Sequence, residues 1–323
     1  MHVAVCCITF RRPDGLRRLL EGLNALRFRK HPEPLVSVIV VDNDAAAPMR
    51  ALIDATRKTF RWRMLYDCEP ARGLSSARNR ALDLVPPDAN CIAWIDDDEV
   101  PVPGWLDELL HVRRTYRASI VQGPVRPHFL APPPRWLVRG RFLELGPYRD
   151  GHDLHFASTC NSLIDADLVR RLRLRFDPRF DRTGGEDQRF FGCAIAAGHR
   201  VVTAEQALVD EAIPASRATL RYLLRRRFRM GTTLAVIDRI EGGKGRLALR
   251  ALKGVGRIGI GVAQSATVVS QGLAGLAGSL CTIAWGAGSL AGLFGVTHRE
   301  YDVVSAAPAD LREGSSAAGS GPG

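Results

Sequence analysis

Residues Asp96 to Glu99 place four carboxyl groups in a row, directly after the apolar run Cys91–Ile95. Carboxylates crowded at the end of a buried strand repel one another unless a positive partner neutralises them. A divalent cation such as Mg²⁺ or Mn²⁺ takes oxygen ligands, and one or two protein carboxylates suffice when water and substrate phosphates complete its shell. We therefore predict a divalent cation here, with a solvated acidic turn as the alternative.

Two other apolar runs also end in polar residues. The run from Val3 continues into Thr9-Phe10-Arg11-Arg12, and the run Val36–Val41 continues into Asp42-Asn43-Asp44. Ligands of mostly parallel sheets bind beyond the carboxyl ends of the strands, where an acid commonly accepts hydrogen bonds from a nucleoside. We expect the three strand ends to form one pocket, although an Asp that caps the next helix would explain Asp42 equally well.

Two glycine-containing motifs lie at predicted helix starts. The segment Gly73–Asn79 offers backbone N–H groups and the guanidinium of Arg78 to an anion, or else forms a capped surface helix. The segment Gly184-Gly185-Glu186-Asp187 places a flexible turn before two adjacent carboxylates. Such a position suits a well-oriented catalytic base and, equally, an acid at a helix N-terminus.

Arginines dominate the predicted helix Arg217–Thr233, which contains no acidic residue. They are Arg217, Arg221, Arg225, Arg226, Arg227 and Arg229. Spacing by four would place Arg217, Arg221 and Arg225 on one helix face. We expect phosphates of a donor, of a lipid-linked acceptor or of anionic headgroups as partners, with a plain solvated face as the alternative.

The net charge of +11 is concentrated in this region. Between Arg217 and Arg257 there are 12 Lys and Arg residues but only two acidic ones, so the rest of the chain is almost neutral. This distribution argues against a nucleic-acid partner and favours contact between one segment and an anionic membrane surface. Seven cysteines without a CxxC pair, and an N-terminus without a signal sequence, lead us to expect a reducing, cytosolic compartment.

The scaffold is predicted from composition and periodicity. The 323 residues, 46% of them hydrophobic, can bury a large core. Short Val- and Ile-rich runs alternate with amphipathic stretches over residues 1–125, which predicts an α/β, Rossmann-like, mostly parallel sheet flanked by helices. The expected strands are Val3–Thr9, Val36–Val41, Met64–Tyr66, Cys91–Ile95 and Ile120–Gln122, and the expected helices are Gly15–Leu26, Met49–Thr59, Leu74–Leu84 and Trp105–Tyr116.

A second α/β stretch is expected after a loop-rich connection at Gly123–Asp153. Its elements are a strand at Phe156–Ile164, a helix at Glu186–Ala197 and the basic helix. We predict a catalytic domain at residues 1–235, with a nucleotide-binding half at 1–125 and an acceptor and catalytic half at 126–235. Basic and apolar membrane-associating helices would follow at 236–300, and a disordered tail at 301–323, of which Ala309–Gly323 is Gly/Ser/Ala-rich.

The segment Ile258–Val296 has 39 residues and no charged side chain. It fits two short membrane crossings, a re-entrant pair, or helices that lie in the interface. Basic residues before it and His298-Arg299 after it would place both ends on the cytoplasmic side.

Taken in order, these motifs resemble glycosyltransferase family 2, whose inverting members have the GT-A fold, across Val3–Gly231. The motifs are Thr-Phe-Arg-Arg-Pro, Val-Val-Asp-Asn-Asp, Gly-Leu-Ser-Ser-Ala-Arg-Asn, Asp-Asp-Asp-Glu, Gly-Gly-Glu-Asp and Arg-Arg-Arg-Phe-Arg-Met-Gly. Residues 160–163 and 182–187 are most similar to members that transfer glucose from UDP-glucose to a polyprenyl-diphosphate-linked oligosaccharide in exopolysaccharide biosynthesis. The resemblance implies a metal-dependent, inverting hexosyltransferase that adds one sugar at the cytoplasmic face of a membrane.

The resemblance also implies roles for individual residues. Asp187 would be the catalytic base, Asp98 would hold Mn²⁺ or Mg²⁺, Asp96 would contact the metal or the ribose, and Asp42 would contact the uridine. Further candidates for donor binding are Thr9, Arg11, Arg78, Asp97, Glu186, Arg225 and Arg229. Relatives often have a His after the last core strand, where this chain has Asp210. Asp210 could replace it as an oxygen ligand, but its charge would be unfavourable beside a diphosphate.

Three other functions are compatible with parts of the pattern. A nucleotidyltransferase would carry a glycine-rich loop after the first strand, which residues 9–13 lack. A processive synthase would carry several long membrane helices. A non-catalytic membrane scaffold would keep the fold, but the presence of Asp96, Asp98 and Asp187 together argues against it. Within the family, a different donor sugar or glycan remains an alternative to glucose.

Overall fold

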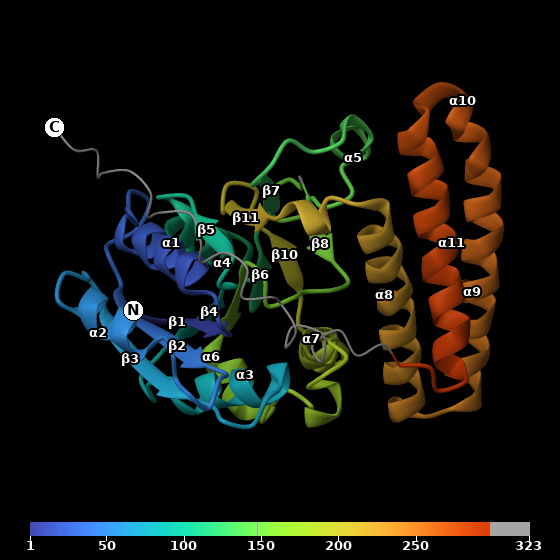
Figure 1. The fold of residues 1–323 in the computed structure, drawn as a ribbon. Coiled ribbons are helices and arrows are strands. Elements are labelled where there is room, and N and C mark those ends of the chain that lie inside the picture. Colours follow the sequence, from blue (N-terminus) through green and yellow to red (C-terminus); the bar gives the residue numbers. More distant parts are fainter. Residues whose placement is uncertain (147, 298–323) are drawn as a thin grey trace, which may run out of the picture.

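The computed structural model of the chain describes residues 1–146 and 148–297, so the predicted tail at 301–323 lies outside the described residues. An eight-stranded sheet forms the centre, with the strand order β3-β2-β1-β4-β9-β6-β10-β8 (Figure 1). Its strands are β1 His2–Thr9, β2 Leu35–Asp42, β3 Arg63–Cys68, β4 Cys91–Trp94, β6 Ile120–Gln122, β8 Asp153–Leu154, β9 Ser162–Asp165 and β10 Val201–Thr203. Strands β3, β2, β1 and β4 run parallel, whereas β9 is antiparallel to both β4 and β6.

Helices cover both faces of this sheet. The helices α1 Pro13–Asn24, α2 Arg50–Arg57 and α4 Trp105–Tyr116 pack on one face, and α3 Leu74–Asp83, α6 Ala166–Arg171 and α7 Glu186–Ala196 pack on the other. Alternation along β1 explains this, because Val3 and Val5 face the leucines of α1 while Ala4 and Cys6 face the small side chains of α3. The predicted α/β fold is therefore confirmed, with element ends shifted by a few residues.

A smaller sheet corrects the prediction of a loop-rich connection at Gly123–Asp153. It has the order β5-β11-β7, with β5 Glu99–Pro101, β11 Val209–Ile213 and β7 Val125–Phe129. Pro127 concealed β7 in the sequence, and it is tolerated because β7 lies at the sheet edge, where a missing N–H costs no ladder bond. The same connection also contains the short helix α5 Arg135–Gly140.

The strand predicted at Phe156–Ile164 is shorter than expected, because only Ser162–Asp165 is extended. Asn161 interrupts it with a φ of 52°, in the left-handed region. The buried Asn161 amide donates to the carbonyl oxygens of Pro124 and Ala207, both at 2.7 Å, and accepts from the Trp105 indole at 2.6 Å. Asn161 therefore fastens the two sheets together.

Three long helices stand side by side next to the sheet domain (Figure 1). They are α8 Leu220–Glu241, α9 Lys244–Gln264 and α11 Leu273–Leu293; the short helices are η1 Pro178–Phe180, η2 Ala215–Arg217, η3 Ser265–Thr267 and α10 Val268–Gln271. The basic helix predicted from Arg217 actually begins at Leu220, because the Thr219 hydroxyl caps it by accepting from the Tyr222 N–H. Arg217 lies on η2, so it does not share a helix face with Arg221 and Arg225. The boundary predicted at residue 235 falls inside α8.

The uncharged segment is divided between the second half of α9 and α11. Within the described residues, α11 alone is long and apolar enough to cross a membrane by length and composition, and 44% of that stretch is buried inside the fold. Helix α11 lies between α8 and α9, and glycines allow the close approach. A Cβ on Gly288 would lie 2.0 Å from the Phe228 carbonyl oxygen of α8, and one on Gly286 would lie 2.6 Å from the Gly254 oxygen of α9.

We predict that Gly288→Ala destabilises the helical bundle, because the new methyl group meets the backbone of α8 and must push the helices apart. The expected loss is about 1–3 kcal/mol in the free energy of unfolding, measured by denaturant titration. Gly278→Ala on the same helix is the control, because its Cβ would make only an ordinary 3.8 Å contact with Phe142. Higher helix propensity should stabilise this control by up to about 1 kcal/mol. Equal effects of the two substitutions would contradict the close packing of α8 and α11.

Candidate functional site

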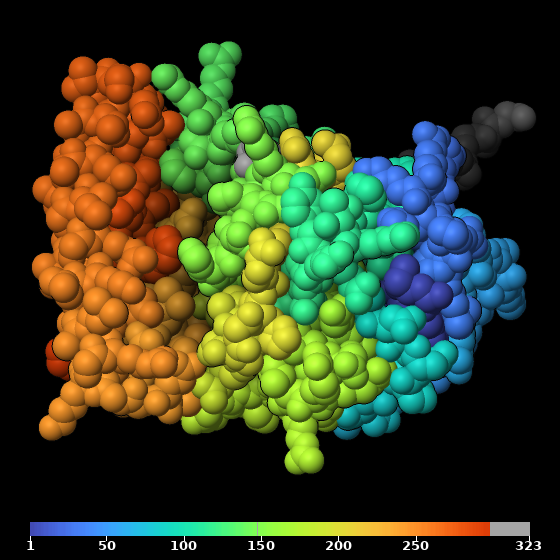
Figure 2. All heavy atoms as spheres, turned by 180° about the vertical axis from the view of Figure 1, so that it is seen from behind, coloured from blue at the N-terminus to red at the C-terminus, as the bar shows by residue number. Residues whose placement is uncertain are grey.

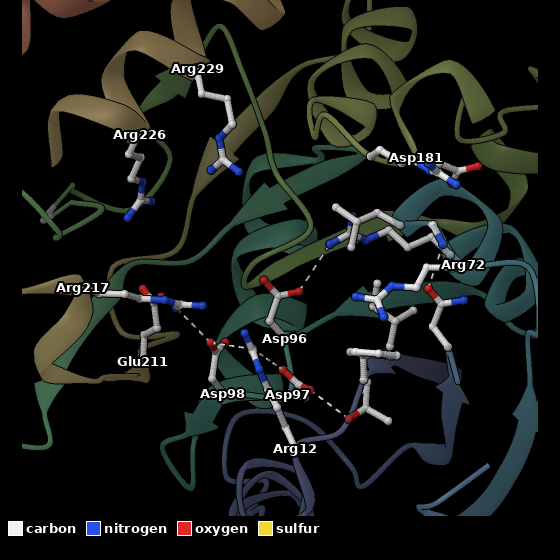
Figure 3. Close-up of a pocket in the computed structure, with 18 of the residues that line it drawn as sticks. Arg12, Arg72, Asp96, Asp97, Asp98, Asp181, Glu211, Arg217, Arg226 and Arg229 are labelled. Carbon is white, nitrogen blue, oxygen red and sulfur yellow. Dashed lines mark hydrogen bonds and ion pairs between the residues drawn. The ribbon is translucent and has the colours of Figure 1, made fainter. Parts of the chain in front are cut away.

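A cleft of about 270 Å³ lies at the carboxyl ends of β1, β2 and β4, where the sheet faces η2 and α8 (Figure 3). Its lining is rich in charged side chains: Arg12, Arg72, Arg78, Asp96, Asp97, Asp98, Asp181, Arg182, Glu211, Arg217, Arg226 and Arg229. Thr9, Asn43 and Gly73 also line it. The predicted convergence of the three strand ends is therefore present.

Asp97 is occupied by contacts within the protein. Its carboxylate accepts a hydrogen bond from the Thr9 hydroxyl and another from Arg12, both at 2.8 Å. Burial raises the pKa of Asp97 to about 6, and Arg12 opposes this shift. Thr9 and Asp97, both predicted to bind the donor, thus hold each other at the junction of β1 and β4.

Asp98 is the carboxylate to which two arginines converge. Arg12 approaches it to 2.9 Å and Arg217 to 3.1 Å (Figure 3). Arg217 also lies 3.3 Å from Glu211 on β11 and so bridges the two acids. Each of these carboxylates can bind a cation, and each arginine can bind a phosphate if a ligand displaces its present partner.

Side chains on β11 alternate between the two faces of the sheet. This alternation decides whether Asp210 can replace the His that relatives often have after the last core strand. Asp210 points away from the cleft and pairs with Arg126 of β7 at 2.6 Å, whereas Glu211 lines the cleft. The interpretation of Asp210 as a substitute metal ligand is therefore wrong. Sequence analysis overlooked Glu211, although the period of two along β11 would have shown that only one of the two acids can face the site.

Arg78 joins α3 to the start of α7. Its guanidinium pairs with Glu186, and it lies 3.5 Å from Asp96. The side chains of Arg78 and Glu186 are only 7% and 3% exposed, so this is a buried ion pair. Burial raises the pKa of Glu186 to about 7 despite Arg78. Arg78 and Glu186, both predicted to bind the donor, thus hold the start of α7 against α3.

Asp187 follows Glu186 in the first turn of α7 and is half-buried. Burial raises the pKa of Asp187, and the positive charges of Arg78 and Arg229 counteract this effect. The negative charge of Asp187 in turn helps to raise the pKa of Asp96, which places the two carboxylates in one electrostatic environment. A base whose pKa is raised accepts a proton more readily than an exposed aspartate does.

Asp42 is fully buried at the end of β2. One carboxylate oxygen, Oδ2, accepts hydrogen bonds from the Met49 N–H and the Tyr66 hydroxyl, both at 3.0 Å. The other oxygen, Oδ1, is buried and has no hydrogen-bond partner among the described residues. Such an atom is costly to leave unpaired. Asp42 itself does not line the cleft, but the next residue, Asn43, does.

Other predicted residues lie at the margin of the cleft or outside its lining. Arg11 pairs with Asp44 on an exposed loop, and Arg225 is exposed. On α8 the predicted Arg229 does line the cleft, together with Arg226, and both point towards Asp96 (Figure 3). Their spacing by three places Arg226 and Arg229 on one face of the helix.

The start of α3 already carries an anion from the protein itself. Asp181 accepts hydrogen bonds from the Ser76 N–H at 2.9 Å and from the Ser76 hydroxyl at 3.0 Å. The predicted anion site at Gly73–Asn79 is therefore filled by a carboxylate. The loop before α7 is thereby attached to α3.

The cleft offers a divalent metal two carboxylates rather than a complete set of protein ligands. Within residues 1–146 and 148–297, no three His, Cys, Asp or Glu side chains converge as a complete binding group. Asp96 and Asp98 nevertheless lie together at the floor of the cleft. Two carboxylates suit Mg²⁺ or Mn²⁺ when a substrate diphosphate and water supply the remaining oxygens, so the residues fit a metal that binds together with the donor.

This sheet, with acidic residues at its strand ends, defines a GT-A type glycosyltransferase. The chain belongs to glycosyl transferase family 2, whose family profile matches residues 4–173. It is 37% identical over 234 residues to the succinoglycan biosynthesis protein ExoM of Rhizobium meliloti (strain 1021). The matched region covers 72% of this chain and 74% of that protein.

Solved structures support the same fold. S. aureus TarS residues 1–349 in complex with UDP-GlcNAc superposes with a TM-score of 0.53 at 13% identity, over 93% of each chain. In the longer TarS chain the match spans 42% of its length, with a TM-score of 0.50. GalNAc-T7 with UDP, GalNAc and Mn²⁺ gives a TM-score of 0.52 at 13% identity, over 73% of this chain and 50% of that one.

We predict that Arg78→Met destabilises the fold, because it leaves the buried Glu186 carboxylate without its cation. Breaking such a pair costs about 3–5 kcal/mol, which denaturant unfolding will measure. The double variant Arg78→Met with Glu186→Gln should recover part of this loss, since the buried charge of Glu186 is then removed together with its partner, while Asp96 still loses Arg78. A double variant as unstable as the sum of the two single variants would contradict the pairing.

Proposed function

We propose that the protein is a metal-dependent, inverting glycosyltransferase that transfers a single sugar from a UDP-sugar, with glucose the favoured sugar, to a lipid-linked saccharide in exopolysaccharide biosynthesis. The observation that carries this proposal is the cleft in which Asp96 and Asp98 face arginines of η2 and α8. Family membership and the identity to a succinoglycan biosynthesis protein support it. The solved relatives with UDP and UDP-GlcNAc are consistent with a nucleotide-sugar donor.

The donor is expected to lie across the strand ends. The buried Oδ1 atom of Asp42 is an acceptor suited to the uracil N–H, and Phe10 and Asn43 line the adjacent part of the cleft. The diphosphate would lie near Asp98, where Arg12 and Arg217 can exchange a carboxylate for phosphate oxygens. Arg226 and Arg229 add positive charge on the side of α8.

Asp98 and Asp96 would hold the metal, and a bound Mg²⁺ or Mn²⁺ supplies the neutralisation of the diphosphate leaving group. Asp187 acts as the general base. As the acceptor hydroxyl oxygen forms a bond to the anomeric carbon, its proton passes to Asp187 and the carbon–oxygen bond to the diphosphate breaks, releasing the nucleoside diphosphate. Attack from the side opposite the leaving group inverts the configuration. Arg78 and Glu186 hold Asp187 in position from behind.

The cytoplasmic face of a membrane is the proposed location. The support comes from the basic α8 and α9, from the apolar α11, and from the relative's part in the synthesis of a polysaccharide. Acceptors that carry a polyprenyl chain are held in the bilayer, so an enzyme that uses them must work at its surface.

We predict that Asp187→Asn abolishes transfer while nucleotide binding persists, because the amide keeps the shape but cannot accept a proton. The rate should fall at least about 10²-fold, the usual contribution of a general base. Nucleotide release would be measured with Mn²⁺ or Mg²⁺, a panel of UDP- and GDP-sugars and a lipid-linked acceptor extract. Turnover retained in this variant would exclude Asp187 as the base. Nucleotide binding without turnover in the wild type, given a competent acceptor, would overturn the proposed function.

Asp98 and Asp210 were both considered as metal ligands from the sequence, and substituting each in turn tells them apart. Asp98→Asn should raise the metal concentration needed for half-maximal nucleotide binding by roughly tenfold or more, because the ion loses a charged ligand. Asp210→Asn removes the same charge from the outward side of β11, where the partner is Arg126. It should leave the metal requirement unchanged. Calorimetric titration of UDP at graded Mn²⁺ measures both, and equal effects would show that the assignment of faces on β11 is wrong.

A further inference from the structure

A second cavity also borders α8, and it shares no lining residue with the donor cleft. It measures about 360 Å³ and lies between the three-helix bundle and the residues that follow α5. Its polar and charged lining consists of Arg227, Gln264, Thr267, Gln271, Ser279, Thr282 and Trp285. Arg226 faces the donor cleft and the next residue, Arg227, faces this cavity, so α8 presents arginines to two separate spaces.

Two guanidinium groups lie near one indole ring, that of Trp285, and of these two arginines Arg227 lines the cavity itself. Arg257 of α9 lies 4.4 Å from the centre of the Trp285 ring, and Arg227 of α8 lies 5.8 Å from it. Arg227 already contacts the Met230 sulfur at 3.8 Å and the Cys281 thiol. The Trp285 indole nitrogen is buried without a hydrogen-bond partner among the described residues, and so is one terminal nitrogen of Arg257, Nη1. Two unused N–H donors and two positive charges thus lie around one ring at the edge of the cavity.

No carboxylate among the described residues pairs with either arginine. The acids of α8, Asp238 and Glu241, pair instead with Arg250 and Arg246 of α9. Helix α11 contains no charged residue. Burial lowers the pKa of both Arg227 and Arg257, and the charges of Arg226 and Arg250 add to this effect, while the Cys281 thiol opposes it at Arg227. Two partly buried cations without an acidic partner favour the binding of an anion from outside.

The surroundings of the cavity indicate that this anion belongs to a lipid. Near its rim, Val269 of α10 is 95% exposed, Leu273 of α11 is 66% exposed and Val138 of α5 is 51% exposed. The helices α5 and α10 adjoin here, because Arg139 donates to the Ser270 carbonyl oxygen at 3.2 Å. A space-filling view shows this end beside the broad outer surface of α9 (Figure 2). Exposed apolar side chains around a cationic cavity are suited to a bilayer surface.

The outer side of α9 extends the same apolar surface. Leu249, Leu252 and Val255 are exposed on it, and so are Ile260 and Val262. A soluble helix would carry charged side chains on its outward face, but here the basic residues gather at the first half of the helix. Apolar side chains beside Lys and Arg are the composition of a helix that lies in a membrane interface.

We propose that the cavity lined by Arg227 and Trp285, with Arg257 beside the Trp285 ring, binds the phosphate group of a lipid while the adjacent apolar residues contact the bilayer. Phosphate oxygens accept hydrogen bonds from both guanidinium groups and from the indole N–H. This inference deepens the proposed membrane association. It requires neither donor nor turnover, so that either proposal can fail alone.

The test is calorimetric titration of the full chain, without nucleotide or metal, using three soluble probes. Dihexanoyl phosphatidic acid carries both phosphate and acyl chains, dihexanoylglycerol carries only the chains, and inorganic phosphate carries only the anion. We expect saturable binding of phosphatidic acid, at least about tenfold tighter than binding of either other probe, because each charge-assisted bond contributes roughly a factor of ten. Inorganic phosphate that binds as tightly as phosphatidic acid would overturn the assignment to a lipid.

A matched pair of double variants distinguishes this site from general charge attraction. Arg227→Gln with Arg257→Gln should weaken phosphatidic acid binding at least about tenfold. Lys244→Gln with Lys253→Gln removes the same charge from exposed positions on α9 and should change it less than about threefold. Equal losses in the two double variants would overturn the proposal. If the arginine double variant does not fold, Gly278→Leu provides the test, because its side chain fills the cavity without changing the charge. Unchanged binding of phosphatidic acid to that variant would contradict the site.

Discussion

Repulsion between carboxylates is the constraint on which the rest of this structure depends. Acids from three separate segments meet at one edge of the sheets: Asp96, Asp97, Asp98, Glu99, Glu186, Asp187 and Glu211. Bringing like charges into a partly dehydrated cleft is unfavourable, and burial raises the pKa of several of these acids. Such a cluster persists only where cations are supplied at the same place.

Arginines from distant parts of the chain supply those cations and thereby hold the architecture together. Arg12 comes from the end of β1, Arg78 from α3 and Arg217 from the entry to the helical bundle. Each binds an acid that lies far away in sequence, so each ion pair is also a link between elements. The segment that leads into the C-terminal helices is thus part of the site. A diphosphate and its metal would compete for these same partners, which makes the cleft responsive to its ligand.

The sequence allowed prediction of the strand ends but not of the pairs that form there. Hydrophobic runs and the polar residues after them located Asp42 and Asp96–Asp98, because local patterns determine where a strand stops. The partner of Arg78 is Glu186, which lies 108 residues later, and no local pattern contains that information. Glu211 could have been found from the alternation along β11, had that strand been recognised. The face of α8 that meets the cleft was misjudged because the packing of α8 against α11 determines how the helix is rotated about its axis, and no local pattern contains that information.

The arginine run of α8 shows how one local sequence meets two different electrostatic environments. Successive residues on a helix point about 100° apart, so neighbours in the run cannot face the same space. Arg226 lines a cleft rich in carboxylates, whereas Arg227 lines a cavity that no described carboxylate lines. Composition alone treats the two as equivalent positive charges. Their surroundings differ, so the anion proposed for each differs too: a nucleotide diphosphate for Arg226 and a lipid phosphate for Arg227.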